Sequence, residues 1–179
     1  MKRRAILAAG LACAFVVAPV GRAESVSVPV KGGSLLLDHP KGWKSSVSGP
    51  LVSPTLRLTS VPEGTFEVLI TALGSETQLP SDDALAGRVR TQGEKLLPSA
   101  EQTSLEMTPV KGAQARGYLF HLTDKKPEKG PGDFRELYQG GVVVAPLLLS
   151  VTVLTHSGDA ATVKAALETL AGARFQAAK

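Results

Sequence analysis

The 179-residue sequence is poor in residue types that several functions require. Its single cysteine, Cys13, excludes an intrachain disulfide and a cysteine-based zinc cluster. It has no asparagine, which excludes Asn-linked glycosylation. Aromatic residues make up only 4% of the chain, whereas sugar and single-stranded nucleic-acid binders stack their ligands on several exposed rings. We interpret the one tryptophan, Trp43 after Gly42, as a core anchor that follows a turn.

The first 23 residues have the pattern of a secretory signal peptide. A basic start, Met1–Arg4, is followed by the uncharged stretch Ala5–Val20. Small residues at Gly21 and Ala23 suit a signal peptidase, so we expect a mature chain that begins at Glu24. The apolar stretch is short for a transmembrane helix, although a retained N-terminal anchor stays open as an alternative. The sequence therefore predicts an exported protein, periplasmic or extracellular, with no transmembrane segment in its mature chain.

Cys13 raises the question of lipidation, because a cysteine in an export signal can carry a lipid anchor. Lipoprotein signals place a leucine-like residue three positions before the cysteine, and here that residue is Gly10. The apolar stretch also continues beyond Cys13, as expected if it belongs to the hydrophobic region of an ordinary signal. We favour cleavage after Ala23 over a lipoprotein anchored at Cys13.

Removal of residues 1–23 changes the charge of the protein. Four of its 20 basic residues precede the cut and all 16 acidic residues follow it, so the mature chain carries 16 of each. A neutral chain lacks the basic stripe that nucleic acids or an anionic membrane surface would need, so we expect no nucleic-acid partner. Residues 24–179 are enough for one domain with an ordinary core. The lack of asparagine and the abundance of alanine, glycine, valine and leucine are typical of a GC-rich bacterial genome.

Hydrophobic patterning predicts eight strands and two helices in the mature chain. The expected strands are residues 26–30, 34–39, 56–60, 66–73, 104–110, 115–123, 134–144 and 147–155. The expected helices are residues 82–97 and 159–171, the first started by Pro80–Asp83 and the second stopped by Gly172. We expect turns at Pro40–Trp43, Val61–Gly64 and Ala145–Pro146.

The mid-chain helix presents one apolar face, formed by Leu85, Val89 and Leu96. Gly87 and Gly93 weaken this prediction, because a glycine costs a helix interior about 1 kcal/mol relative to alanine. Two strands, residues 66–73 and 147–154, carry apolar residues on both faces, which is typical of central strands that are covered on both sides. The prediction is an α+β fold with a mostly antiparallel sheet sandwiched between helices, and Val151 fully buried in it.

The order of these elements resembles the PsbP-like fold family. The features that carry the resemblance are Pro40–Trp43, Phe66–Ile70 before the first helix, Gly117–Tyr118 opening a strand, and Ala173–Phe175 after the last helix. The pattern covers nearly the whole of residues 24–179 and is similar to photosystem PsbP, exported DcrB-like proteins, LpqN-like lipoproteins and a Ran-binding nuclear protein. The resemblance implies a binding or accessory role, and it offers no shared catalytic residue for this chain.

Motifs for chemistry are scarce. The histidines His39, His121 and His156 are far apart, and no His-x-x-x-His pair is present. We interpret His39 as a turn residue, His121 as a sheet-face histidine that pairs locally, with Asp124 as one partner, and His156 as part of the turn before the second helix. The Gly-x-Ser-x-Gly nucleophile motif is missing. We therefore assign no catalytic, metal-binding or cofactor-binding residue and expect no cofactor.

Three functional hypotheses remain. We expect a non-enzymatic accessory or binding protein of the bacterial cell envelope that contacts another envelope protein. The alternative is a carrier that holds a small apolar ligand in a pocket between helix and sheet, where such pockets commonly form. A hydrolase with an unrecognised site is the third hypothesis, and a histidine–aspartate pair that faces a cleft would favour it.

Overall fold

A computed structural model describes residues 23–74 and 78–179, so the predicted signal peptide, apart from Ala23, lies outside the described residues. The strands are β1 Glu24–Val30, β2 Gly33–His39, β3 Lys44–Ser48, β4 Thr55–Thr59, β5 Phe66–Gly74, β6 Glu106–Lys111, β7 Ala115–Thr123, β8 Glu136–Val144, β9 Leu147–Thr155 and β10 Arg174–Ala177. The helices are α1 Asp82–Leu96, which continues into a 3-10 turn over Leu97–Ser99, and α2 Ala160–Ala171.

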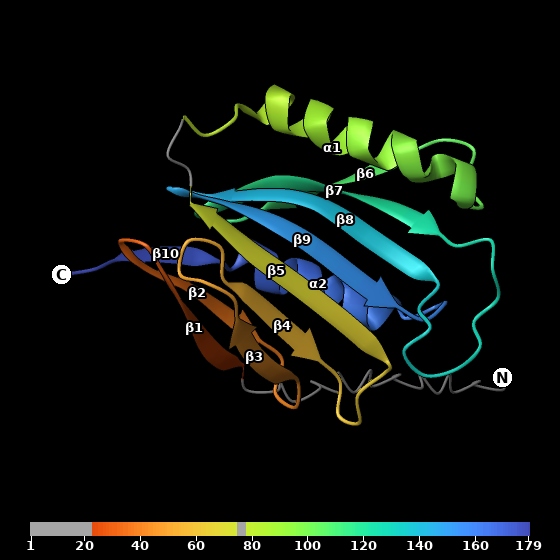
Figure 1. The fold of residues 1–179 in the computed structure, drawn as a ribbon, viewed down its shortest axis with the longest axis horizontal. Coiled ribbons are helices and arrows are strands. Elements are labelled where there is room, and N and C mark those ends of the chain that lie inside the picture. Colours follow the sequence, from red (N-terminus) through yellow and green to blue (C-terminus); the bar gives the residue numbers. More distant parts are fainter. Residues whose placement is uncertain (1–22, 75–77) are drawn as a thin grey trace, which may run out of the picture.

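The strands form two sheets (Figure 1). The larger sheet has seven strands in the order β3-β4-β5-β9-β8-β7-β6, and the smaller has three in the order β1-β2-β10. Every strand pairing in the described part of the chain is antiparallel. Short turns join β1 to β2, β6 to β7 and β8 to β9, as is typical of antiparallel neighbours, whereas the longer connection of residues 124–135 joins β7 to β8. The prediction of a mostly antiparallel α+β fold is confirmed.

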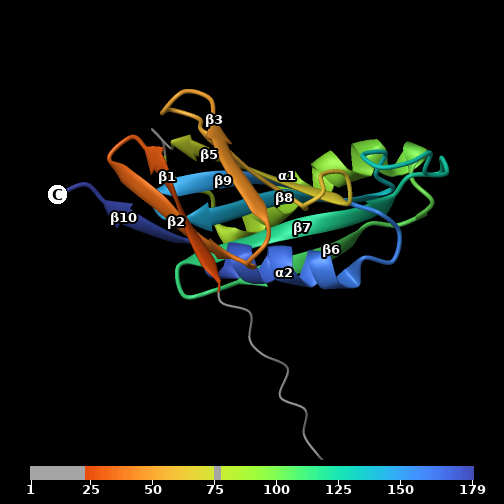
Figure 2. The same ribbon diagram turned by 90° about the horizontal axis from the view of Figure 1, so that it is seen from below.

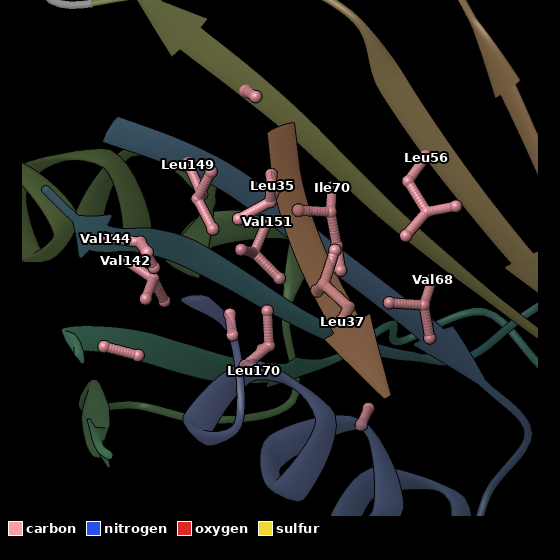
Figure 3. Close-up of a cluster of buried hydrophobic side chains, with 14 of the residues drawn as sticks. Leu35, Leu37, Leu56, Val68, Ile70, Val142, Val144, Leu149, Val151 and Leu170 are labelled. Atoms are coloured by element: carbon pink, nitrogen blue, oxygen red, sulfur yellow. The ribbon is translucent and has the colours of Figure 1, made fainter. Parts of the chain in front are cut away.

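The larger core lies between the two sheets and α2. Leu35 and Leu37 of β2 and Leu170 of α2 point toward Ile70 and Val151 of the seven-stranded sheet (Figure 3). These side chains are at most 1% exposed, so the predicted burial of Val151 is confirmed. Removal of so much apolar surface from water is the main favourable contribution to folding.

A second, smaller core lies under α1. Figure 2 shows α1 on the face of the large sheet opposite to α2. Leu85 and Val89 of α1 pack there against Phe120 and Leu122 of β7 and Val143 of β8. The two helices thus lie on opposite faces, which matches the expected sandwich only loosely. On one face of the large sheet, α2 packs beside the small sheet. On the other face, α1 covers only β7 and β8.

The strands that are covered on both sides differ from those predicted. In β5 and β9 buried residues alternate with half-exposed or exposed ones, so only one face of each is fully buried. The doubly covered strands are β7, with Leu119 and Phe120, and β8, with Val142 and Val143. The reason is the position of α1, which lies over β7 and β8 and leaves the outer face of β5 and β9 partly open.

Two strands, β3 and β10, were not predicted. All five residues of β3 are exposed, so it shows no alternation of apolar and polar residues. The strand β10 has four residues and pairs with β2, far away in the sequence. Both are edge strands of their sheets, where burial imposes little pattern.

The local predictions around the turns and helix ends are confirmed. Gly42 has φ +90°, and the N–H of Trp43 donates to the carbonyl of Pro40 over 3.3 Å. The Ser81 hydroxyl caps α1 by accepting from the N–H of Ala84, and α2 ends before Gly172. Neither helix in the two described ranges is long and apolar enough to cross a membrane.

Candidate binding surfaces

The four edge strands of the two sheets differ in how they are protected. An unpaired edge invites another strand, and proline or side-chain cover prevents this. Edge strand β1 contains Pro29, edge strand β6 contains Pro109, and in β10 the N–H of Phe175 donates to the Gln114 side chain. The strand β3, Lys44–Ser48, has no proline, and it pairs with β4 alone. Among the described strands β3 therefore offers the most open edge.

Exposed apolar side chains gather next to this edge. The large apolar residues with substantial exposure are Val47 (42%), Leu51 (63%), Val52 (63%), Val61 (71%) and Leu73 (38%). Val47 belongs to β3, and Leu51 and Val52 belong to the loop between β3 and β4. Leu73 lies near the end of β5, next to this loop, because the N–H of the following Gly74 donates to the carbonyl of Val52 over 3.5 Å. We call β3 and its loop, residues 44–52, the β3 edge.

A groove lies between α1 and the open outer face of β9, and we call it the α1–β9 groove. It consists of two adjoining hollows of about 690 Å³ and 170 Å³, and Leu73, Arg88 and Leu148 line both. Gly141 and Leu85 line the smaller hollow, and a methyl group at position 141 would come within 2.9 Å of the Leu85 side chain. Apolar side chains thus form most of the smaller hollow's floor.

The charged residues that the structure describes in the lining of the α1–β9 groove are basic. Lys31 and Arg88 line the larger hollow, and neither hollow has an aspartate or glutamate among its described lining residues. Within residues 23–74 and 78–179, the guanidinium of Arg88 makes no hydrogen bond or ion pair. The guanidinium of Arg88 is therefore available to an anion in the groove.

A polar network surrounds His121 on β7. Its Nε2 lies 2.6 Å from Oε2 of Glu136 on β8, and the same carboxylate oxygen accepts a 3.0 Å hydrogen bond from the hydroxyl of Thr123. The amide of Gln102 donates to that hydroxyl over 2.8 Å. The imidazole stacks on the ring of Tyr138 at 4.3 Å, and burial raises the pKa of the Tyr138 hydroxyl. The pairing of His121 with Asp124 was wrong, because the antiparallel register brings Glu136 to it instead.

His121 also lines a shallow hollow with Ser104 and Glu106. A histidine–carboxylate pair at a cleft is the arrangement that would favour a hydrolase. In the described part of the chain, however, no serine hydroxyl is hydrogen-bonded to His121. The network thus holds the side chains on this face of the sheet in place.

The two other histidines are separate from this network. His39 is the last residue of β2, not the turn residue that the sequence suggested; it is 2% exposed, and its Nδ1 lies 3.0 Å from the carbonyl of Pro40. His156 connects three loops: its Nε2 lies 2.8 Å from the carbonyl of Gly64, and its Nδ1 lies 3.1 Å from the carboxylate of Glu128. The hydrogen bond from the backbone N–H of Ser157 lowers the pKa of Glu128, and the hydrogen bond with the His156 side chain lowers it further. The structure brings no two of the three histidines together.

Sequence reasoning missed both candidate surfaces. The β3 edge gave no periodic signal, and the α1–β9 groove depends on the position of α1, which periodicity does not reveal. The one available clue was the cluster Val47, Leu51 and Val52 beside Gly49–Pro50, which is apolar at a point where the pattern indicated a loop.

Comparisons with known proteins support the fold. No protein-family model and no curated protein matches the sequence. The solution structure of cyanobacterial PsbP (CyanoP) from Synechocystis sp. PCC 6803 is similar, with a TM-score of 0.50 and 15% sequence identity over 89% of this chain and 96% of that chain. The chain thus has a PsbP-like fold. The closer resemblance to DcrB-like and LpqN-like exported proteins stays a prediction.

Proposed function

We propose that this chain is an exported accessory protein of the bacterial cell envelope that acts by binding another protein and catalyses no turnover. The observation that carries the proposal is the β3 edge, an open strand edge with exposed apolar residues beside it. The signal-like first 23 residues support the location.

The β3 edge fits a partner that binds as an extended strand. In this mode main-chain hydrogen bonds along an edge supply affinity, and alternate side chains supply specificity. Three of the five residues of β3 are serines with small side chains. Lys44 is long, but its Nζ donates to Glu63 over 2.9 Å and so is held toward the β4–β5 loop. A partner strand would meet free backbone groups along β3 and would cover Val47 and Leu51.

The experiment is cross-linking in the native envelope from a photoreactive residue in place of Ser46. Val47→Lys tests the edge, because a lysine on an edge strand opposes strand addition. Val61→Lys is the control, since it places the same charge on another exposed valine, which lies in the β4–β5 loop outside the β3 edge. We expect a discrete adduct that Val47→Lys removes and Val61→Lys keeps. An adduct that survives Val47→Lys, or no adduct at all, would contradict the proposal.

A second candidate function is the carriage of a small apolar ligand. The specific observation in its favour is the α1–β9 groove, since ligand pockets form between helix and sheet and are lined mainly by apolar side chains. Native mass spectrometry of the protein purified from its own envelope would detect both a ligand and a protein partner. A carrier would retain a small mass that is released when the protein unfolds.

A further inference from the structure

The position of Arg88 gives the α1–β9 groove a chemical preference. Arg88 follows Leu85 by one helical turn on the side of α1 that faces β9, and both hollows of the groove include it in their lining. Its guanidinium has no partner among the described residues. A guanidinium is a fork of N–H donors suited to carboxylate and phosphate groups. The groove therefore combines an available anion-binding side chain with an apolar floor.

The floor beneath Arg88 is open because α1 does not extend over β9. Leu148 is half-buried and Leu73 is 38% exposed, so both keep apolar surface in contact with solvent. The smaller hollow, of about 170 Å³, lies between these residues and Leu85 and Val89 of α1. An apolar cavity of about 150 Å³ is known to hold a benzene molecule. The hollow thus has room for several methylene groups, and a longer chain would extend into the larger hollow.

We infer that the α1–β9 groove binds a single-chain anionic amphiphile, with its carboxylate or phosphate at Arg88 and its hydrocarbon chain over Leu73 and Leu148. The inference rests on the carrier function put forward above as the second candidate. It adds the charge of the head group and the residue that recognises it. Among the described lining residues, no aspartate or glutamate would repel such a head group.

The test is a titration of the purified mature protein, labelled with ¹⁵N, with three probes below their micellar concentrations. Decanoate carries the anionic head, 1-decanol is its neutral counterpart and decyltrimethylammonium its cationic counterpart. We expect decanoate to shift the amide signals of Arg88, Gly141 and Leu148, and to bind more tightly than the two other probes. The preference should weaken as salt is added, because ions screen an exposed charge pair.

Two variants locate the site. Arg88→Gln should weaken decanoate binding by about two- to fivefold, the usual contribution of an exposed ion pair, and should leave decanol binding unchanged. Arg90→Gln is the matched control, because Arg90 is exposed on the same helix and lines neither hollow. Ser150→Leu should remove binding of every probe, since the exposed Ser150 lines the smaller hollow and a leucine there fills it. An unchanged melting temperature shows that this variant is folded.

The outcomes separate the head-group inference from the carrier function. If decanol binds as tightly as decanoate and Arg88→Gln has no effect, the head-group inference is wrong and the carrier function stands. If no probe binds, both are wrong. Vesicles that contain phosphatidylglycerol form the last arm, because their head groups are also anionic. Binding to vesicles without binding to decanoate would overturn the inference in favour of a membrane surface.

Discussion

Gly93 of α1 lies directly against Phe120 of β7, so that a methyl group at position 93 would come within 2.9 Å of the ring carbon Cγ of Phe120. It would also meet the Leu105 side chain at 2.6 Å. Phe120 is fully buried and has no space into which its ring can move. The glycine that weakens the helix prediction is thus the residue that lets α1 approach the sheet.

Gly93→Ala should therefore destabilise the protein by about 1–2 kcal/mol, since the overpacking cost exceeds the gain in helix propensity. Gly87→Ala is the control, because position 87 is exposed and no atom lies within 4 Å of an added methyl group. It should stabilise the protein by up to about 1 kcal/mol. Urea denaturation measures both changes, and equal effects of the two substitutions would contradict the close contact.

Sequence patterning predicted those strands and helices in which one buried face makes apolar residues recur at a regular spacing. Strands such as β7 and β9 and both helices follow from alternation, caps and breakers. The sequence pattern did not predict contacts that depend on strand register or on the position of a helix. His121 meets Glu136 because β7 and β8 pair in one register, and no spacing along the chain indicates it. The same holds for β3, whose residues Lys44–Ser48 face solvent throughout and show no period.

Asp38 connects the three strands of the small sheet and makes its stability depend on pH. Arg174 of β10, then Ser25 of β1, hydrogen-bond its carboxylate and lower the pKa of Asp38 below 3.8. A carboxyl whose pKa is lowered on folding stabilises the protein above its unfolded pKa, and this contribution disappears as the pH falls through the folded value.

Asp38→Asn should accordingly lower the unfolding free energy at pH 7 by up to about 1 kcal/mol, a small effect because the pair is partly exposed. The difference from wild type should shrink once the pH falls below about 3.8. Arg174→Gln removes the same pair and should reproduce this pH dependence. Denaturation at a series of pH values checks both, and a difference that persists at the lowest pH would refute the role of the pair.

Replacement of the histidines tests the choice between binding and catalysis. His121→Gln should cost about 1 kcal/mol of stability, because it disturbs the hydrogen bonds around Glu136, and should leave the cross-link from position 46 intact. His39→Gln and His156→Gln should also retain the cross-link. A stable His→Gln variant that keeps its partner but loses the host phenotype would favour an enzyme.

Export is tested by the N-terminus of the protein in the envelope fraction. Signal peptidase should cut after Ala23, so that the mature chain begins at Glu24. N-terminal sequencing of the purified protein reads this directly. A chain that begins at an acylated Cys13, or one that retains Met1, would show a lipid anchor or an uncut leader instead.

The most direct test of the binding claim is amide hydrogen exchange in β3, measured for the isolated protein and for the complex that the position-46 cross-link captures. A partner strand that hydrogen-bonds to the free edge would protect backbone N–H groups along Lys44–Ser48. We predict slower exchange in β3 on complex formation and unchanged exchange in β6, whose edge carries Pro109. Unchanged exchange in β3, with new protection around His121, would contradict the account.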